Sequence, residues 1–160
     1  MFQKNNLVKC SGLLLIMASI GISVWLTHHV GYAINLTDSL PHKLYLVRLN
    51  KIPKKGDYVL FKALSSKQLP EGATLTKKIM GIKGDLITEK KGHFYINGYW
   101  VAKAKTHSLT GKPLSKGPTG ILGEGQYYVG VEHQDSFDSR YQEIGWVSQN
   151  QCIGVAYPIW

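Results

Sequence analysis

The sequence predicts a mainly β domain behind one N-terminal transmembrane helix. One long apolar run occupies the first part of the 160-residue chain, and short alternating segments follow from residue 43 onward. No stretch after residue 40 has the periodicity of a helix. We therefore expect residues 1–34 to form a cytoplasmic tip and an anchor. Residues 35–160 are expected to form one β-rich domain, a barrel or a folded-over sheet.

The apolar run extends from Leu7 to Leu26 and contains one charge, Lys9. About 20 residues at 1.5 Å each cross a hydrocarbon core of about 30 Å, so the run is long enough for one span. Lys4 and Lys9 at its start place the N-terminus in the cytoplasm and the domain outside. A cleaved signal peptide is the alternative. We favour retention, because the run is longer than a usual signal-peptide core and residues 32–34 are a poor cleavage site.

The predicted strands are short and separated by turn residues. Pro53 and Gly56 mark one turn, and Asn97-Gly98 gives the strongest signal, because this pair favours a type I′ hairpin turn. Residues 103–123 are rich in Lys, Gly, Pro and Ser and are expected to run over the surface. The predicted strands are residues 43–49, 58–61, 74–82 and 86–88, the hairpin 93–101, and residues 126–131 and 151–157.

The net charge of +9 favours an anionic partner, either nucleic acid or lipid. Because the lysines are scattered and an apolar segment comes first, we favour membrane lipid and expect no nucleic acid. Cys10 and Cys152 would face different aqueous phases across a bilayer, so no disulfide within the chain is expected. The six histidines lack metal-ligand spacing, and no cofactor motif is present. We therefore expect neither a metal nor a cofactor.

Four short motifs follow the apolar run in a fixed order. Each is weak alone, but together they are specific. The motifs are Ser39-Leu40-Pro41, Gly56-Asp57, Lys77-Lys78 followed by Gly81, Gly84 and Asp85, and Ser136-Phe137-Asp138-Ser139-Arg140.

This combination resembles the type I signal peptidase family. The resemblance implies a signal-peptidase-like domain in which Ser39 is the nucleophile and Lys77 is the base of a Ser-Lys dyad. It also implies supporting roles for Ser136, which would orient the lysine, and for Asp138 and Arg140, which would brace the site as a charged pair.

The residues around the serine narrow the resemblance. Asn35-x-Thr37-x-Ser39-x-Pro41, followed by Leu44-Tyr45, looks like the TraF-type peptidases of conjugative plasmids. Those enzymes mature the conjugative pilus subunit, and some join its new ends into a ring. The resemblance implies a serine endopeptidase of the bacterial inner membrane with a periplasmic catalytic domain. Its partners would be a pilin or preprotein substrate and components of the conjugative transfer (type IV secretion) apparatus.

Alternative functions remain open at this point. A general leader peptidase would use the same residues, and a non-catalytic structural component of a transfer apparatus would keep only the fold. Cleavage and cyclisation both use Ser39 and Lys77, so the sequence does not decide between them.

The residues also suggest how the dyad would work. A lysine is a base only when it is neutral, and its ordinary pKa is about 10.4, so burial must lower that pKa. Leu75 and Ile79 share a strand face with Lys77, whereas Lys78 points the other way and should be solvated. The backbone N–H of Ser39 would be one donor of an oxyanion hole. The Thr37 hydroxyl, two residues away on the same face, would be the second.

Three features depart from the family pattern or oppose the dyad. Residues 130–133 read Gly-Val-Glu-His where the family often has Gly-Asp-Asn-Arg, and residues 142–144 intervene before Gly145. Asp38 would favour a charged Lys77 if it faced that side chain, but alternation along an extended chain turns it away.

One rival mechanism uses a histidine base. His133 precedes Asp135 and Asp138, so a triad with Ser39 is conceivable.

Overall fold

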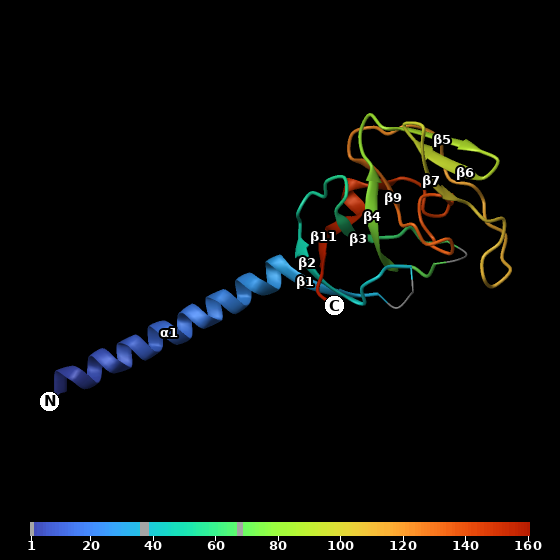
Figure 1. The fold of residues 1–160 in the computed structure, drawn as a ribbon. Helices are drawn as coiled ribbons and strands as arrows, with labels where there is room; N and C mark the ends of the chain where they lie inside the picture. The colour runs from blue at the N-terminus through green and yellow to red at the C-terminus, as the bar shows by residue number, and fades with distance from the viewer. Residues whose placement is uncertain (1, 36–38, 67–68) are drawn as a thin grey trace.

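The computed structural model describes residues 2–35, 39–66 and 69–160, with the side chains of the first helix described from residue 15 onward. The helix α1 (Phe2–His29) projects from a β body, and its N-terminal end lies far from that body (Figure 1). Within the described residues, no helix is both long and apolar enough to cross a membrane. The anchor predicted over residues 1–34 therefore stays a prediction.

The described strands form two antiparallel sheets. The main sheet has the spatial order β1 (Val30–Ile34), β2 (Leu44–Leu49), β11 (Cys152–Pro158), β3 (Tyr58–Lys62), β4 (Thr74–Gly81), β9 (Gln126–Gly130) and β10 (Val147–Ser148). The small sheet has the order β7 (Tyr99–Lys103), β6 (His93–Ile96), β5 (Leu86–Lys90) and β8 (Gly120–Ile121). It lies at the opposite end of the body from α1 (Figure 1). A 3-10 turn, η1 (Gln149–Gln151), precedes β11.

Strand β11 holds the two halves of the main sheet together. It pairs with β2 on one side and with β3 on the other, although it is the last described strand along the chain. Gly154 permits the close approach to β2, because a Cβ there would lie 2.3 Å from the carbonyl oxygen of Arg48. Ser39 lies between β1 and β2, and Lys77 lies in β4, so β11 connects the half that carries one to the half that carries the other.

The core consists of clusters whose members alternate along the strands, as the period of two requires. One cluster fills the main sheet around Val59, Phe61, Ile79, Val129 and Val147. A second packs the small sheet against β9 through Ile87, Phe94, Ile96, Leu122 and Tyr128. A third contains Leu40, Tyr45, Val47, Val131 and Ala156, and it fixes the chain directly beside Ser39.

The prediction of a mainly β body is confirmed, and the predicted strands match the observed ones within a few residues. Asn97 and Gly98 have φ angles of 51° and 83°, as a type I′ turn requires. Strand β1 was not predicted. Its sequence, VGYAI, continues the apolar run without a turn residue, so pairing with β2 has no local signal.

Candidate active site

Lys77 is buried in the middle of the main sheet. Strand β4 pairs with β3 on one side and β9 on the other, and its side chains alternate between the core and the solvent. Lys77 is 5% exposed and lies on the same side as Ile79, whereas Lys78 is exposed. The alternation predicted from the sequence is therefore observed.

The Lys77 amine lies between two hydroxyl groups. Its Nζ is 3.1 Å from Ser39 Oγ and 2.8 Å from Ser136 Oγ. Burial lowers the pKa of Lys77 from 10.5 to about 8; the negative charge of Asp138 acts against this change, and the positive charge of Arg140 reinforces it. About a tenth of this lysine is therefore neutral at pH 7, against less than a thousandth at its ordinary pKa, and the neutral amine is the form that a general base requires.

Ser39 lies in a turn between β1 and β2, at the edge of the buried region. The next residue, Leu40, is 3% exposed and packs in the third core cluster, which holds the serine in place. Thr37 and Asp38, for which we predicted a second oxyanion donor and an outward-facing carboxylate, lie outside the described residues.

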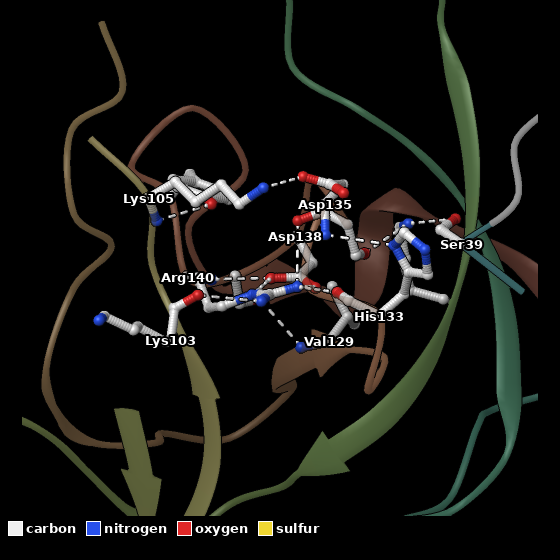
Figure 2. Close-up of polar contacts among 12 residues, drawn as sticks. Ser39, Lys103, Lys105, Val129, His133, Asp135, Asp138 and Arg140 are labelled. Carbon is white, nitrogen blue, oxygen red and sulfur yellow. Dashed lines mark hydrogen bonds and ion pairs between the residues drawn. The ribbon is translucent and has the colours of Figure 1, made fainter. Parts of the chain in front are cut away.

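Asp138 and Arg140 form a buried ion pair (Figure 2). Arg140 Nε donates to Asp138 Oδ1 and Nη2 donates to Oδ2, each at 2.8 Å, in the two-pronged geometry that suits a guanidinium and a carboxylate. Arg140 also donates to the backbone carbonyls of Lys103, His133 and Ser136. It thereby fixes the loop that presents Ser136. We call Lys77, Ser136, Asp138 and Arg140 the buried polar cluster.

Gly117 braces this loop from outside. Its N–H donates to the carbonyl of Arg140 at 2.7 Å, and a Cβ at this position would lie 2.1 Å from the carbonyl oxygen of Ser139. Only glycine fits such a contact. Sequence reasoning missed this residue, because it lies in the surface segment 103–123 and its contact partner is more than twenty residues away.

Two of the four motifs contain residues that hold the chain around β4 in place. The N–H of Gly56 donates to the carbonyl of Ile79 at 2.8 Å, and the N–H of Ile79 donates to the carbonyl of Asp57, also at 2.8 Å. These bonds extend the pairing of β4 next to Lys77. The Asp85 carboxylate accepts bonds from Lys55 and from the side chain of Asn97. It thus joins the turn after β4 to the hairpin of the small sheet.

The departures in residues 130–133 are accommodated by backbone contacts. A Cβ at Gly130 would lie 2.9 Å from Met80 Sδ, Val131 packs in the third core cluster with Leu40, and the carbonyl of His133 accepts a bond from Arg140. In the inserted segment 142–144, Ile144 is buried and the chain turns so that Gly145 N–H donates to Tyr141.

His133 is exposed, and neither nearby carboxylate orients its ring. Its Nδ1 accepts a bond from the backbone N–H of Asp135 at 3.2 Å. Lys105 binds the Asp135 carboxylate and lowers its pKa, while Arg140 binds that of Asp138 (Figure 2). A Ser-His-Asp triad needs a carboxylate on the histidine, so this geometry favours Lys77 as the base.

A pocket of about 880 Å³ opens from Ser39. The hairpin of the small sheet forms part of its lining through Ile96, Tyr99, Trp100 and Val101. Among the described residues, no group of His, Cys, Asp and Glu side chains could hold a metal ion.

Comparisons with known proteins point to one family. Residues 4–160 match the family model described as signal peptidase, peptidase S26. A search of curated proteins found no match. Among solved structures, the chain is similar to the crystal structure of a signal peptidase I from Enterococcus faecalis V583. The two share 24% sequence identity, the match covers 66% of this chain and 97% of that chain, and the TM-score is 0.42.

Proposed function

The protein belongs to the S26 signal peptidase family, and we propose that it cleaves its substrate with a Ser39-Lys77 dyad. Membership makes it a serine peptidase of the signal peptidase type, with a preprotein as its substrate. The main support for this dyad is the contact of Lys77 Nζ with Ser39 Oγ, in a site where burial lowers the pKa of the lysine to about 8.

In the proposed mechanism, neutral Lys77 takes the proton of Ser39 as Oγ attacks the substrate carbonyl carbon. Ser136 Oγ accepts a bond from Nζ and keeps the amine aimed at Ser39. The N–H of Ser39, with the hydroxyl of Thr37, stabilises the oxyanion. The lysine then gives its proton to the departing amine, which leaves an acyl-enzyme on Ser39.

The acyl-enzyme can be resolved in two ways. Water releases a shortened chain, whereas the amino end of the same substrate would form a new peptide bond and close a ring. We propose a conjugative pilin precursor as the substrate, because the residues from Asn35 to Tyr45 resemble the TraF-type enzymes. Components of the transfer apparatus would then be its partners.

We further propose that α1 anchors the protein in a bacterial inner membrane, with the N-terminus in the cytoplasm and the domain in the periplasm. From residue 15 onward the helix carries exposed apolar side chains on several faces, including Leu15 at 73%, Ile22 at 60% and Trp25 at 56%. A helix that is apolar all round and is not covered by protein suits lipid.

The test is mass spectrometry of a pilin precursor incubated with the full-length protein in detergent. We expect a product that is lighter by a terminal peptide, and a further loss of one water if the ring closes. Ser39→Ala and Lys77→Ala should abolish the product, while Lys90→Ala, at an exposed lysine of β5, should not.

Other outcomes would identify the alternatives. Cleavage that survives Lys77→Ala but not His133→Ala would establish the histidine base instead. Processing of an ordinary signal-peptide precursor, but not of the pilin, would indicate a general leader peptidase. No product from any precursor would leave the non-catalytic structural role.

A further inference from the structure

The pocket beside Ser39 is too large for one small substrate side chain. Its volume of about 880 Å³ falls within the range of roughly 300–1,000 Å³ that is typical of sites for drug-sized ligands, so it can hold several residues of a peptide. Its wall is mostly apolar, with Leu40, Ile79, Met80, Ile96, Val101 and Val131 among the lining residues. A bulky apolar group is the ligand that such a wall favours.

Tyr99 lines this pocket from the small sheet, whereas Ser39 lines it from the turn between β1 and β2. It begins β7, next to the Asn97-Gly98 turn, and it pairs with Ile96, which also lines the pocket. Its side chain is 80% exposed, so its ring has little contact with the protein itself. An exposed aromatic ring on a rigid hairpin is a common contact for a partner, because little conformational entropy is lost when it binds.

The hairpin that carries Tyr99 is held in place. Asn97 Nδ2 donates to Asp85 Oδ1 at 2.7 Å, and the indole N–H of the neighbouring Trp100 donates to His93 Nδ1 at 3.2 Å. These bonds hold the backbone of the hairpin, and Tyr99 lines the pocket from that hairpin. The small sheet also lies at the opposite end of the body from α1 (Figure 1), which favours a peptide over the membrane as the occupant.

We propose that Tyr99 is a specificity-determining residue that binds a bulky apolar side chain of the substrate, at least two residues from the bond that is cut. This inference rests on the proposed role of Ser39, because the pocket is a substrate site only if the reaction occurs at its mouth. It adds an apolar requirement at a position away from the bond that is cut.

The test uses a library of proteome-derived peptides, cleaved by the full-length protein in detergent and sequenced by mass spectrometry. Wild type should favour Leu, Phe, Tyr or Trp at one position two to six residues from the cut. Tyr99→Ala should lower that preference about tenfold or more, because the loss of one apolar contact changes specificity by about that factor. Tyr99→Phe should restore it.

The matched control is Trp160→Ala, because Trp160 is an aromatic residue that is 81% exposed and does not line the pocket. It should cleave with the wild-type preference. An equal apolar preference in Tyr99→Ala and wild type, or none in wild type, would overturn the inference while leaving the dyad in place. Absence of any Ser39-dependent cleavage by the wild type would overturn the proposed function itself, and this inference with it.

Discussion

The interior of the small sheet and the buried polar cluster are equally shielded from water but are stabilised in opposite ways. Ile87, Phe94 and Leu122 in the core of the small sheet are at most 1% exposed. Burial of each of these apolar side chains stabilises the fold by about 1.5–3 kcal/mol. Asp138 and Arg140, also at most 1% exposed, are tolerated only as a pair.

The comparison explains the state of Lys77. Arg140 binds the carboxylate of Asp138 and partly compensates its charge, and the Lys77 amine contacts the hydroxyls of Ser39 and Ser136 instead. Burial lowers its pKa, and the charge of Asp138 opposes that change only in part. The small sheet stabilises the fold through apolar burial. The buried polar cluster instead holds the Lys77 amine where its charged form is disfavoured, which lowers the stability of the folded state.

Breaking the ion pair should have the largest effect. Arg140→Met leaves the Asp138 carboxylate buried and unpaired, and we expect the free energy of unfolding to fall by about 3–5 kcal/mol. The negative charge of Asp138, no longer compensated by Arg140, should also raise the pKa of Lys77. The pH midpoint of activity should then lie at a higher pH. Denaturant titration should show that adding Asp138→Leu recovers most of the stability. A double variant as unstable as the single one would contradict this account.

Removing the amine should stabilise the protein. At pH 7 the folded state must bury a lysine whose pKa is about 8 rather than 10.5, so Lys77→Met should gain up to about 3 kcal/mol and lose activity. The gain should shrink as the pH rises from 8 to 10.5, because the unfolded lysine then loses its proton too. Denaturant titrations at pH 7 and pH 10.5 check this, with Lys78→Met expected within about 0.5 kcal/mol of wild type.

The rate of cleavage should follow the neutral fraction of Lys77. Below pH 8 we expect kcat/KM to fall about tenfold for each pH unit, and above it to level off. A precursor assay between pH 5.5 and 9.5 measures this. A midpoint near 6.5 would point to a histidine instead.

Ser136→Ala should lower activity without unfolding the protein. It removes the 2.8 Å bond that orients Lys77, so we expect kcat to fall about tenfold to a hundredfold with little change in KM. Ser136→Thr, which keeps a hydroxyl, should recover part of the loss. If both variants cleave as wild type does, Ser136 has no orienting role.

The smallest effect should come from the small sheet. Gly98 has a φ of 83° with open space around it, so Gly98→Ala should cost about 1–2 kcal/mol of stability through backbone strain alone. The pH midpoint of activity should stay the same, because nothing near Lys77 changes. A shifted midpoint would mean that the two regions are coupled.

Much of the fold could be predicted from local patterns. Alternation in residues 43–49 and 74–82 located β2 and β4 and separated Lys77 from Lys78, and Asn97-Gly98 located the hairpin. These signals depend only on neighbours along the chain. Strand β1 lacked such a signal, because its apolar sequence fits a membrane segment as well as a sheet edge.

The rest depends on contacts between distant residues. No local sequence pattern indicates three of these contacts. They are the bonds of Arg140 to three backbone carbonyls, the fit of Gly117 against Ser139, and the apolar pocket that Tyr99 lines. The motifs indicated which residues meet. They did not indicate that Arg140 screens Asp138 from the lysine.

The central position of β11 has a consequence for biosynthesis. Ser39 belongs to one half of the main sheet and Lys77 to the other, and the strand that pairs with both halves is synthesised more than seventy residues after the lysine. A nascent chain that has already made both residues still lacks the strand that joins them. The site is therefore incomplete on the ribosome, and we expect no cleavage of neighbouring chains before synthesis has passed residue 158.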